Sequence, residues 1–562
     1  MGAAHPSACK GAPVPQALTA PATARLLVAQ LTALGVRDFV VSPGSRSGPL
    51  ALAVAQAERE GRARLTVRLD ERSAAFTAVG LARAAQLAGT PDQAVAIVCT
   101  SGTAVANLHP ALAEARHSGL PLLALTADRP HELRGVGASQ TTNQVGIFGP
   151  TTLEFWELPT GPSPRQVEIL ATRAVTGARG ARSGQAGPVQ VNVALADPLV
   201  DDGAALPAGH VIQVAPTPPP PPVLLPPGGR TVVLAGDGAG KAARQVAEEA
   251  GVPLLAEPSS GARSGPCAIG PYRALLDLPG LGADIERVVA YGRPTLSRPV
   301  TALLARPDLE VIVVAPGGPW TDVAGRARRI ERSVQLPPGD AAWLAAWQAA
   351  GARAQAALAG QRDELTPWSA CLAVWQAQQA GGEPLVVGAS NAIRHLDLCA
   401  PPGPGGPVVA NRGLAGIDGT LATAWGLALG TGQLVRALVG DLTFLHDASS
   451  LLRGQQEAEV DLDIIVLNDG GGAIFSSLEA QQHASAVDFE RVYATPQVAD
   501  LAALAAAYGA DYQRAATLTA LRACLAQPLR GRRIVEVPVS RDAVGEQLAH
   551  IIDQAKEAAR FQ

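Results

Sequence analysis

Short apolar runs alternate with alanine-rich stretches of ten or more residues along most of this 562-residue chain. In the first third, the runs DFVVSPG, LTVRLD and AVAIVCT are each followed by such a stretch, and PLLALTAD leads on towards GPVQVNVAL. Short apolar strands that alternate with helices predict a parallel sheet with helices on both faces. The pattern therefore predicts an α/β protein built of doubly wound parallel sheets.

The alternation restarts twice, which predicts three consecutive domains. The proline-rich segment APTPPPPPVLLPPGG cannot pair inside a sheet and marks a linker. After it, TVVLAGDG begins a second series, and after a helical stretch near 340–360, PLVVGAS begins a third. The first and third series could follow one plan. We expect a flexible leader at 1–20, a first domain at 21–205, a linker at 206–229, a central domain at 230–360 and a third domain at 361–562.

Composition narrows the function classes. Hydrophobic residues make up 47% of the chain, and a net charge of −4 gives no reason to expect nucleic acid or a membrane surface as partner. No stretch of eighteen uncharged apolar residues occurs. The six cysteines are scattered without a C-x-x-C pair, which favours reduced thiols. We expect a soluble cytoplasmic protein, not inserted in a membrane, that acts on small molecules.

The loops that follow the predicted strands carry most of the non-aliphatic residues: SPGSRS, DERS, TSGTA, TADRPHE, NRGLAGIDG, VGDLTF and NDGGGAIF. Ligands of open parallel sheets bind at the carboxyl ends of the strands. This concentration predicts an enzyme. The segment LAGDGAGK is similar to a phosphate-binding loop, but the spacing from Gly236 to Lys241 is one residue short and Ala242 replaces the expected Ser or Thr. We interpret it as a strand–turn–helix element.

Two predicted strand ends combine into a possible metal site. Asp441 follows one apolar run and Asn468 ends the next, and a carboxylate beside an amide oxygen suits Mg²⁺. The carbonyl of Gly470 is the most plausible third ligand, while Gly471 and Gly472 would let the backbone approach phosphate groups. Ordinary β–α turns have the same residue types, so the pattern alone leaves both interpretations open.

An acidic residue stands at another predicted corner, in LDERSAAFTAVGLAR. Helix capping by Asp70 and the helix dipole explain why acidic residues are favoured there. They do not explain why Glu71 should point into a site.

Six blocks, in order, together resemble one family: VVSPGSRSGPLALA, DERSAAF, TSGTAVANLHPAL, LTADRPHEL, NRGLAGIDG and NDGGGAIFSSL. They resemble the 2-succinyl-5-enolpyruvyl-6-hydroxy-3-cyclohexene-1-carboxylate (SEPHCHC) synthases of menaquinone biosynthesis. Gly440-Asp441…Asn468 resembles the thiamine-diphosphate motif, with Leu442 replacing its second glycine. Residues 230–340 match weakly.

The resemblance implies pyrimidine-binding, central and diphosphate-binding domains in that order, and a transferase that uses thiamine diphosphate with Mg²⁺ (Mn²⁺ possible). Such an enzyme decarboxylates 2-oxoglutarate and adds the resulting succinic-semialdehyde carbanion to isochorismate. Glu71 resembles the catalytic glutamate that contacts N1′ of the aminopyrimidine, and Ile417 the apolar residue that bends the cofactor. The implied metal ligands are Asp441, Asn468 and Gly470. The remaining implied cofactor contacts are Ser390, Gly440, Leu442, Gly471, Gly472, Ala473, Ile474 and Phe475.

Both implied substrates carry two carboxylates, which arginine can bind bidentately. Ser45, Arg46, Arg129 and Gln140 resemble residues that face isochorismate. Arg394 and Arg412 resemble those that meet the 2-oxo acid. Asn391 and Phe475 are expected at the same site, and Arg298 is a further carboxylate contact from the central domain. Any one arginine could instead form a structural ion pair, and Arg129 has Asp128 and Glu132 nearby in sequence.

The resemblance also implies a homodimer or homotetramer, with Glu71 of one chain facing Asp441 of another. One alternative is another thiamine-diphosphate enzyme, such as an acetolactate synthase or a 2-oxo acid decarboxylase. The arginine-bearing loops disfavour it, because pyruvate has a single carboxylate. Alternatives of other classes are a nucleotide-binding regulatory protein with a silent thiamine site and a purely structural α/β protein.

Overall fold

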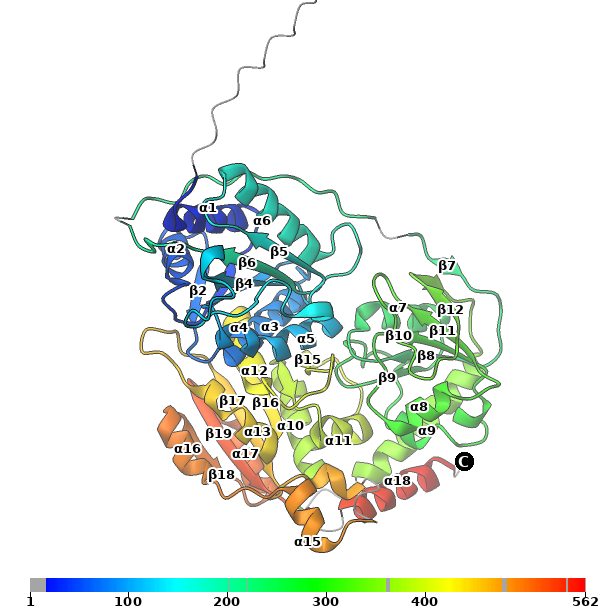
Figure 1. The fold of residues 1–562 in the computed structure, drawn as a ribbon. Coiled ribbons are helices and arrows are strands. Elements are labelled where there is room, and N and C mark those ends of the chain that lie inside the picture. Colours follow the sequence, from blue (N-terminus) through cyan, green and yellow to red (C-terminus); the bar gives the residue numbers. More distant parts are fainter. Residues whose placement is uncertain are drawn as a thin grey trace, which may run out of the picture.

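The computed structural model describes residues 17–201, 203–218, 220–359, 364–477, 483–541 and 544–560. It has three major parallel sheets in succession along the chain, which confirms the predicted α/β class. Figure 1 shows the first sheet in blue and cyan, the second in green and the third in yellow to red. Most of the predicted leader (1–20) lies outside the described residues, as does the predicted boundary at 360–361. The domain boundaries stay predictions.

The first sheet has six parallel strands in the order β2-β1-β3-β4-β6-β5. Its strands are β1 (Asp38–Val41), β2 (Arg64–Val67), β3 (Val95–Cys99), β4 (Leu122–Asp128), β5 (Glu154–Leu158) and β6 (Val189–Ala194). Its helices are α1 (Ala20–Ala33), α2 (Gly48–Arg59), α3 (Glu71–Leu87), α4 (Thr103–Asn107), α5 (His109–Ser118) and α6 (Pro164–Arg179), with short turns η1 (His131–Leu133) and η2 (Gly149–Thr151). Phe39 and Val41 pack in the cluster of α1, α2 and α6, whereas Val40 packs with α3 and α5. Burial on both faces makes the sheet doubly wound.

The third sheet has six parallel strands in the order β15-β14-β16-β17-β19-β18. Its strands are β14 (Leu385–Val387), β15 (Val408–Val409), β16 (Val435–Gly440), β17 (Leu462–Asn468), β18 (Asp511–Arg514) and β19 (Arg532–Pro538). Its helices are α10 (Pro367–Gly381), α11 (Asn391–Cys399), α12 (Thr420–Thr431), α13 (Asp441–His446), α15 (Ala486–Asp488), α16 (Leu501–Tyr508), α17 (Leu518–Ala526) and α18 (Val544–Arg560). Shorter helical segments are η5 (Ala448–Leu451), η6 (Ala473–Ser477) and the π-helix η7 (Phe489–Ala494). When each sheet's strands are counted along the chain, the first and third sheets have the same order, 2-1-3-4-6-5.

The central sheet has five parallel strands in the order β12-β11-β10-β8-β9. Its strands are β8 (Thr231–Ala235), β9 (Leu254–Ala256), β10 (Arg287–Tyr291), β11 (Glu310–Val314) and β12 (Ala327–Glu331). Its helices are α7 (Gly240–Ala250), α8 (Arg298–Leu304) and α9 (Ala341–Ala359), with turns η3 (Tyr272–Ala274) and η4 (Gly282–Asp284). β8, the GDG turn and α7 form the expected strand–turn–helix element. Within the predicted linker, β7 (Val223–Leu224) pairs with β13 (Val334–Gln335).

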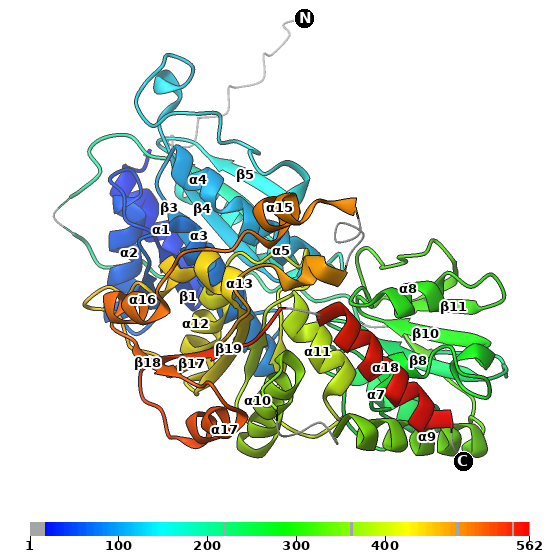
Figure 2. The same cartoon turned by 90° about the horizontal axis from the view of Figure 1, so that it is seen from below.

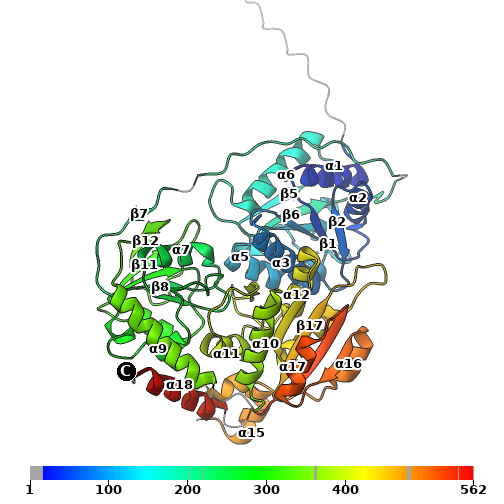
Figure 3. The ribbon, with the colours of Figure 1, turned by 180° about the vertical axis from the view of Figure 1, so that it is seen from behind.

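The C-terminal helix α18 lies beside α9 of the central region, as Figures 2 and 3 both show. It follows the last strand of the third sheet in sequence, so it connects the two regions. Ala555 and Ala559 of α18 pack in the same core cluster as Trp347 of α9. In the described ranges, none of the helices combines the length and apolar character needed to cross a membrane.

The first and third sheets meet through corresponding helices, α3 and α12. Gly80 of α3 and Gly426 of α12 lie at their crossing. A Cβ on Gly80 would lie 2.1 Å from the Thr423 carbonyl oxygen, and one on Gly426 would lie 2.0 Å from the Thr77 carbonyl oxygen. Only glycine therefore allows the two backbones to come this close.

Candidate active site

A cavity of about 160 Å³ lies at the carboxyl end of the third sheet. Its lining brings together many of the residues implicated by sequence: Ser390, Asn391, Ile417, Gly440, Asp441, Leu442, Gly471, Gly472, Ala473, Ile474 and Phe475. β16 ends at Gly440, α13 begins at Asp441, and α11 begins at Asn391. The cavity is therefore formed where three strands of one sheet end and loops or helices follow. Open parallel sheets bind their ligands at such strand ends.

Two carboxylates face this cavity, from Asp441 and Asp469. Asp441 is 5% exposed, and one of its oxygens accepts the Leu442 N–H at 2.8 Å. Burial raises the pKa of Asp441. Burial and the charge of Asp441 raise the pKa of Asp469 to about 7. Asp441 is buried, Asp469 is half-buried, and the charge of Asp441 disfavours ionisation of Asp469, so a cation would stabilise this pair.

The structure places Asp469, and not Asn468, in the cavity lining. The Asn468 side chain donates to Glu536 Oε1 at 2.7 Å, and its Oδ1 accepts the Gly470 N–H at 3.2 Å. Asp469 Oδ1, in contrast, is buried without a hydrogen-bond partner in the described part of the chain. Sequence analysis did not name Asp469, because it considered only the last residue of β17 at this turn. The signal was the acidic residue one position later, in the same turn.

The glycines after Asp469 shape the backbone beneath the two acids. Gly470 and Gly471 have φ angles of +71° and +148°. A Cβ on Gly471 would lie 2.5 Å from the Ala494 carbonyl oxygen and 3.0 Å from Arg541 Nη1. Gly471 and Gly472 line the cavity, whereas Gly470 does not. This cradle, together with the orphaned oxygen of Asp469, fits a divalent cation with a phosphate group.

Arg541 is the neighbouring positive charge. Its charge opposes the upward pKa shifts of Asp441 and Asp469, and its Nη2 lies 2.5 Å from Glu490 Oε2. Arg541 follows β19, and Glu490 belongs to η7. Sequence reasoning identified neither residue, because their contact with the cradle depends on how the last third of the chain folds back.

Two predicted arginines lie next to the cavity without lining it. Arg394 Nη1 donates to the Ser390 carbonyl oxygen at 2.8 Å. Arg412 is 3% exposed, and its Nη2 donates to Thr295 Oγ1 at 3.3 Å. Burial and the charges of Arg412 and Arg273 lower the pKa of Arg394. Arg298, at the start of α8, is exposed and does not line this cavity.

The first sheet holds a separate group of predicted residues at its own carboxyl end. Arg46 is 8% exposed, and its Nη1 donates to the Leu195 carbonyl oxygen at 2.7 Å. Burial, followed by the charge of Arg129, lowers the pKa of Arg46. Ser45 is exposed, and Gln140 is exposed with a positive φ of 54°. Backbone strain of this kind occurs often at functional sites.

Arg129 does not form the structural ion pair that its sequence neighbours allowed. Its Nη2 donates to the Ser139 carbonyl oxygen at 2.9 Å. The Asp128 carboxylate lies 3.0 Å from Arg134 and accepts the Asn192 side-chain N–H at 2.8 Å. Glu132 is exposed. The guanidinium of Arg129 therefore stays next to Arg46, at the end of the strands.

Glu71 is half-buried at the first position of α3. Asp70 caps this helix by accepting the Arg72 and Ser73 N–H groups at 2.8 and 3.3 Å. The neighbours of Glu71 contact the far end of α13, where Arg72 donates to the His446 carbonyl oxygen at 3.0 Å. Glu71 does not line the cavity that begins with Asp441. Capping thus explains Asp70 and leaves the carboxylate of Glu71 unexplained.

Comparisons with known proteins address both ends of the chain. Residues 22–147 match the family model of the thiamine pyrophosphate enzyme N-terminal TPP binding domain, and residues 396–537 match that of the C-terminal TPP binding domain. A 2-succinyl-5-enolpyruvyl-6-hydroxy-3-cyclohexene-1-carboxylate synthase from Kineococcus radiotolerans is 51% identical, over 96% of this chain and 99% of that protein. This chain belongs to the SEPHCHC synthase family.

Two further SEPHCHC synthases agree with this assignment. That of Nocardioides sp. is 47% identical over 94% of this chain and 97% of its own length. That of Paenarthrobacter aurescens is 46% identical over 94% and 95%. The chain is thus a thiamine-pyrophosphate enzyme of a transferase family named for a step of menaquinone biosynthesis, as the motif blocks predicted. Asp441, Asp469 and the glycines after them lie within the region matched by the C-terminal model, and Glu71 lies within the region matched by the N-terminal one.

Proposed function

We propose that this protein catalyses the SEPHCHC synthase reaction on 2-oxoglutarate and isochorismate in menaquinone biosynthesis. One observation carries the proposal: the acids Asp441 and Asp469 stand over a glycine cradle, and one carboxylate oxygen of Asp469 is buried with no partner among the described residues. Such a site suits a metal-bound diphosphate. The family assignment supplies the identity of the two substrates.

We assign the metal to Asp441, Asn468 and the carbonyl of Gly470, as the motif implies, and add Asp469 as a further acidic ligand. Asp441 and Asp469 line the cavity, and Asn468 and Gly470 adjoin Asp469 in the same turn. Mg²⁺ is the expected ion, with Mn²⁺ able to replace it. When bound, thiamine diphosphate supplies an electron sink for decarboxylation and carbon–carbon bond formation.

The apolar side chains around the cavity position the cofactor and exclude water. Ile417 keeps 37% of its surface exposed although it lines the cavity, which suits a residue that packs against a ligand. Leu442, Ala473, Ile474 and Phe475 form a further part of the apolar wall. Ser390 and Asn391 place polar groups at the start of α11, and Gly440 leaves room at the end of β16.

We propose that the site is shared between chains of a homo-oligomer. The cavity of one chain, about 160 Å³, is smaller than the roughly 300–1,000 Å³ of typical ligand sites. Glu71 lies outside this cavity in its own chain. In the proposed assembly, Glu71 from a second copy reaches N1′ of the aminopyrimidine and holds a proton there. The chain would then work as a dimer or tetramer.

The arginines divide between the two substrates in this proposal. Arg46 and Arg129, with Ser45 and Gln140, bind the carboxylates of isochorismate. The charge of Arg129 contributes to lowering the pKa of Arg46, so an anion between the two side chains would be stabilised. Arg394 and Arg412 bind 2-oxoglutarate from the third domain, next to Asn391. Arg298 is assigned a weaker carboxylate contact.

Substrate consumption separates this function from its closest alternative. With thiamine diphosphate and Mg²⁺, we expect product from 2-oxoglutarate plus isochorismate and none from pyruvate alone. Product from pyruvate alone would instead assign an acetolactate synthase or a pyruvate decarboxylase. Binding of ATP without binding of thiamine diphosphate would assign a nucleotide-binding regulatory protein.

We also propose a cytoplasmic location. The five cysteines in the described part of the chain are free and buried, as in a reducing compartment.

A further inference from the structure

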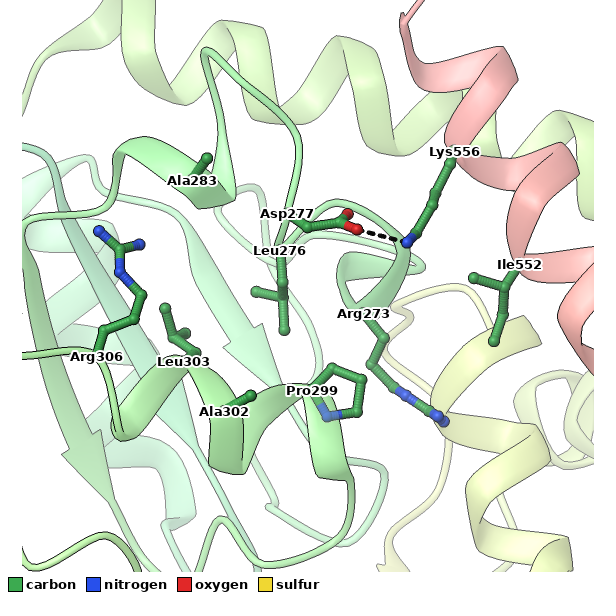
Figure 4. A pocket seen from close by; sticks show the side chains of 10 residues that line it. All are labelled: Arg273, Leu276, Asp277, Ala283, Pro299, Ala302, Leu303, Arg306, Ile552 and Lys556. Atoms are coloured by element: carbon green, nitrogen blue, oxygen red, sulfur yellow. Dashed lines mark hydrogen bonds and ion pairs between the residues drawn. The ribbon is translucent and has the colours of Figure 1, made fainter. Parts of the chain in front are cut away.

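A second cavity lies between the central domain and the C-terminal helix α18 (Figure 4). Its volume is about 530 Å³, within the roughly 300–1,000 Å³ range of sites that enclose small ligands. It lies outside the candidate active site and shares no lining residue with it. Neither the proposed reaction nor the proposed oligomer gives this cavity a role.

Apolar side chains form most of its wall. Leu303 and Ala302 come from α8, Leu276 from the loop after η3, and Ile552 from α18. Figure 4 shows these side chains around the same space, with Ile552 opposite α8. Leu276 and Leu303 also belong to the buried core of the central domain, so core packing holds this part of the wall in place. A wall of this kind favours the apolar body of a ligand.

Three cationic side chains and a single acid complete the lining. The cations are Arg273, Arg306 and Lys556, and the acid is Asp277. Lys556 Nζ lies 2.6 Å from Asp277 Oδ2, and the Asp277 side chain is 61% exposed. An ammonium group has three donors, so this bond leaves donor capacity on Lys556 for a second acceptor.

The two arginines differ in how they are held. Arg306 donates to the Gly282 and Ile285 carbonyl oxygens at 3.0 and 2.9 Å and pairs with Asp308. Arg273 donates to the Arg394 carbonyl oxygen at 3.0 Å. Its Nε lies 3.5 Å from Asp397 and is buried without a hydrogen-bond partner in the described ranges. Acids outside the lining thus offset both arginines, and Lys556 is the cation with donor capacity to spare.

We propose that this cavity binds a small amphipathic anion, with a ring or alkyl body and one carboxylate or sulfonate group. The apolar body packs between α8 and α18. The anionic group accepts from Lys556. The proposal rests on this cavity alone and stands whether or not the proposed function is correct.

Fluorescence titration with 8-anilinonaphthalene-1-sulfonate tests the site in the full-length protein, with thiamine diphosphate and Mg²⁺ saturating. We expect one probe molecule per chain. Ala302→Trp fills the cavity from an exposed position of α8 and should weaken binding at least tenfold. The matched control is Ala305→Trp, at an exposed position just after α8 that does not line the cavity, and it should bind like the wild type. Thermal melting checks that both variants fold.

A second variant tests the choice of an anion. Lys556→Gln keeps an unbranched polar side chain, one atom shorter, but removes its charge. The substitution should weaken binding of the sulfonate probe about fivefold, the usual contribution of a partly exposed ion pair. Binding of the neutral analogue N-phenyl-1-naphthylamine should not change.

Three results would overturn the proposal. The first is a failure of the wild type to bind the sulfonate probe. The second is equal binding by the wild type and Ala302→Trp. The third is self-association of the wild type, seen by sedimentation velocity and lost in Ala302→Trp, because a second copy would then fill the cavity.

Discussion

The first and third sheets have the same strand order but carry different chemistry at their carboxyl ends. Asp128, at the end of β4, and Asp469, just after the corresponding β17, show the difference. Asp128 is paired with Arg134 and hydrogen-bonded by Asn192. Asp469 has an oxygen that no described residue contacts by a hydrogen bond, and its pKa is raised to about 7. One fold thus presents a satisfied acid in one place and an acid poised for a cation in the other.

The comparison shows that the fold fixes where a loop lies, while the loop residues decide what it binds. In the proposed function, the third sheet offers Asp441 and Asp469 to a cation, and the first sheet offers Arg46 and Arg129 to anions. The two ends of a charged cofactor and two dianionic substrates need both kinds of edge. The variants described next test whether the two sheets divide the binding of cation and anions in this way.

Asp469→Asn should have the largest effect. It removes a proposed metal ligand, so we expect affinity for Mn²⁺ in the presence of thiamine diphosphate to fall at least about 100-fold. Isothermal titration calorimetry measures this without relying on turnover. Asp461→Asn, just before the opposite end of β17, is the matched control and should bind as the wild type does. Equal losses in both variants would refute the metal assignment.

Glu71→Gln should keep cofactor affinity but lower kcat by about 10²–10⁴-fold, the usual contribution of a group that moves a proton. Steady-state turnover and cofactor titration measure the two effects separately. Asp70→Asn is the control, because asparagine caps a helix as well as aspartate does. A normal rate in Glu71→Gln would remove this residue from the mechanism.

Arginine substitutions should separate the two edges by substrate. Arg46→Ala should raise the KM of isochorismate about 10–100-fold, as expected for the loss of a charged hydrogen bond, and leave that of 2-oxoglutarate nearly unchanged. Arg412→Ala should do the reverse. Initial-rate kinetics with each substrate varied in turn give both values. If each variant raised both constants equally, the proposed division would be wrong.

Gly426→Ala tests the contact between the corresponding helices α3 and α12. Its new Cβ would lie 2.0 Å from the Thr77 carbonyl oxygen, so we expect a loss of about 1–3 kcal/mol in the free energy of unfolding. Urea denaturation measures it. Gly48→Ala is the control, since a Cβ there meets nothing within 4 Å. An unchanged midpoint for Gly426→Ala would show that α3 and α12 can move apart at little cost in the free energy of unfolding.

The sequence predicted the interior of the fold better than its edges. The buried runs of β3, β4, β16 and β17 are apolar and were recognised. The strands β5, β9, β12 and β18 were not, and each lies at the edge of its sheet. Edge strands have one neighbour and are often partly exposed, so they carry weaker apolar signals. DYQR of β18 and ARRIE of β12 illustrate this.

The site was predictable where chemistry follows directly from a strand end, and less so where it depends on side-chain direction. Asp441 begins α13 immediately after a strand, as expected. Which of Asn468 and Asp469 lines the cavity depends on which side chain Glu536 holds, and Glu536 is distant in sequence. Arg541 reaches the cradle only because β19 returns beside β17. Motif spacing contains none of this information.

Mixed oligomers test the central claim, that Glu71 of one chain completes the metal site of another. Chains carrying Glu71→Gln and chains carrying Asp469→Asn, each with its own affinity tag, can be co-expressed and purified through both tags. Each variant alone should be nearly inactive. A mixed dimer has one site with both residues intact, so it should recover about half of the wild-type activity. Activity no higher than that of the single variants would contradict the shared site.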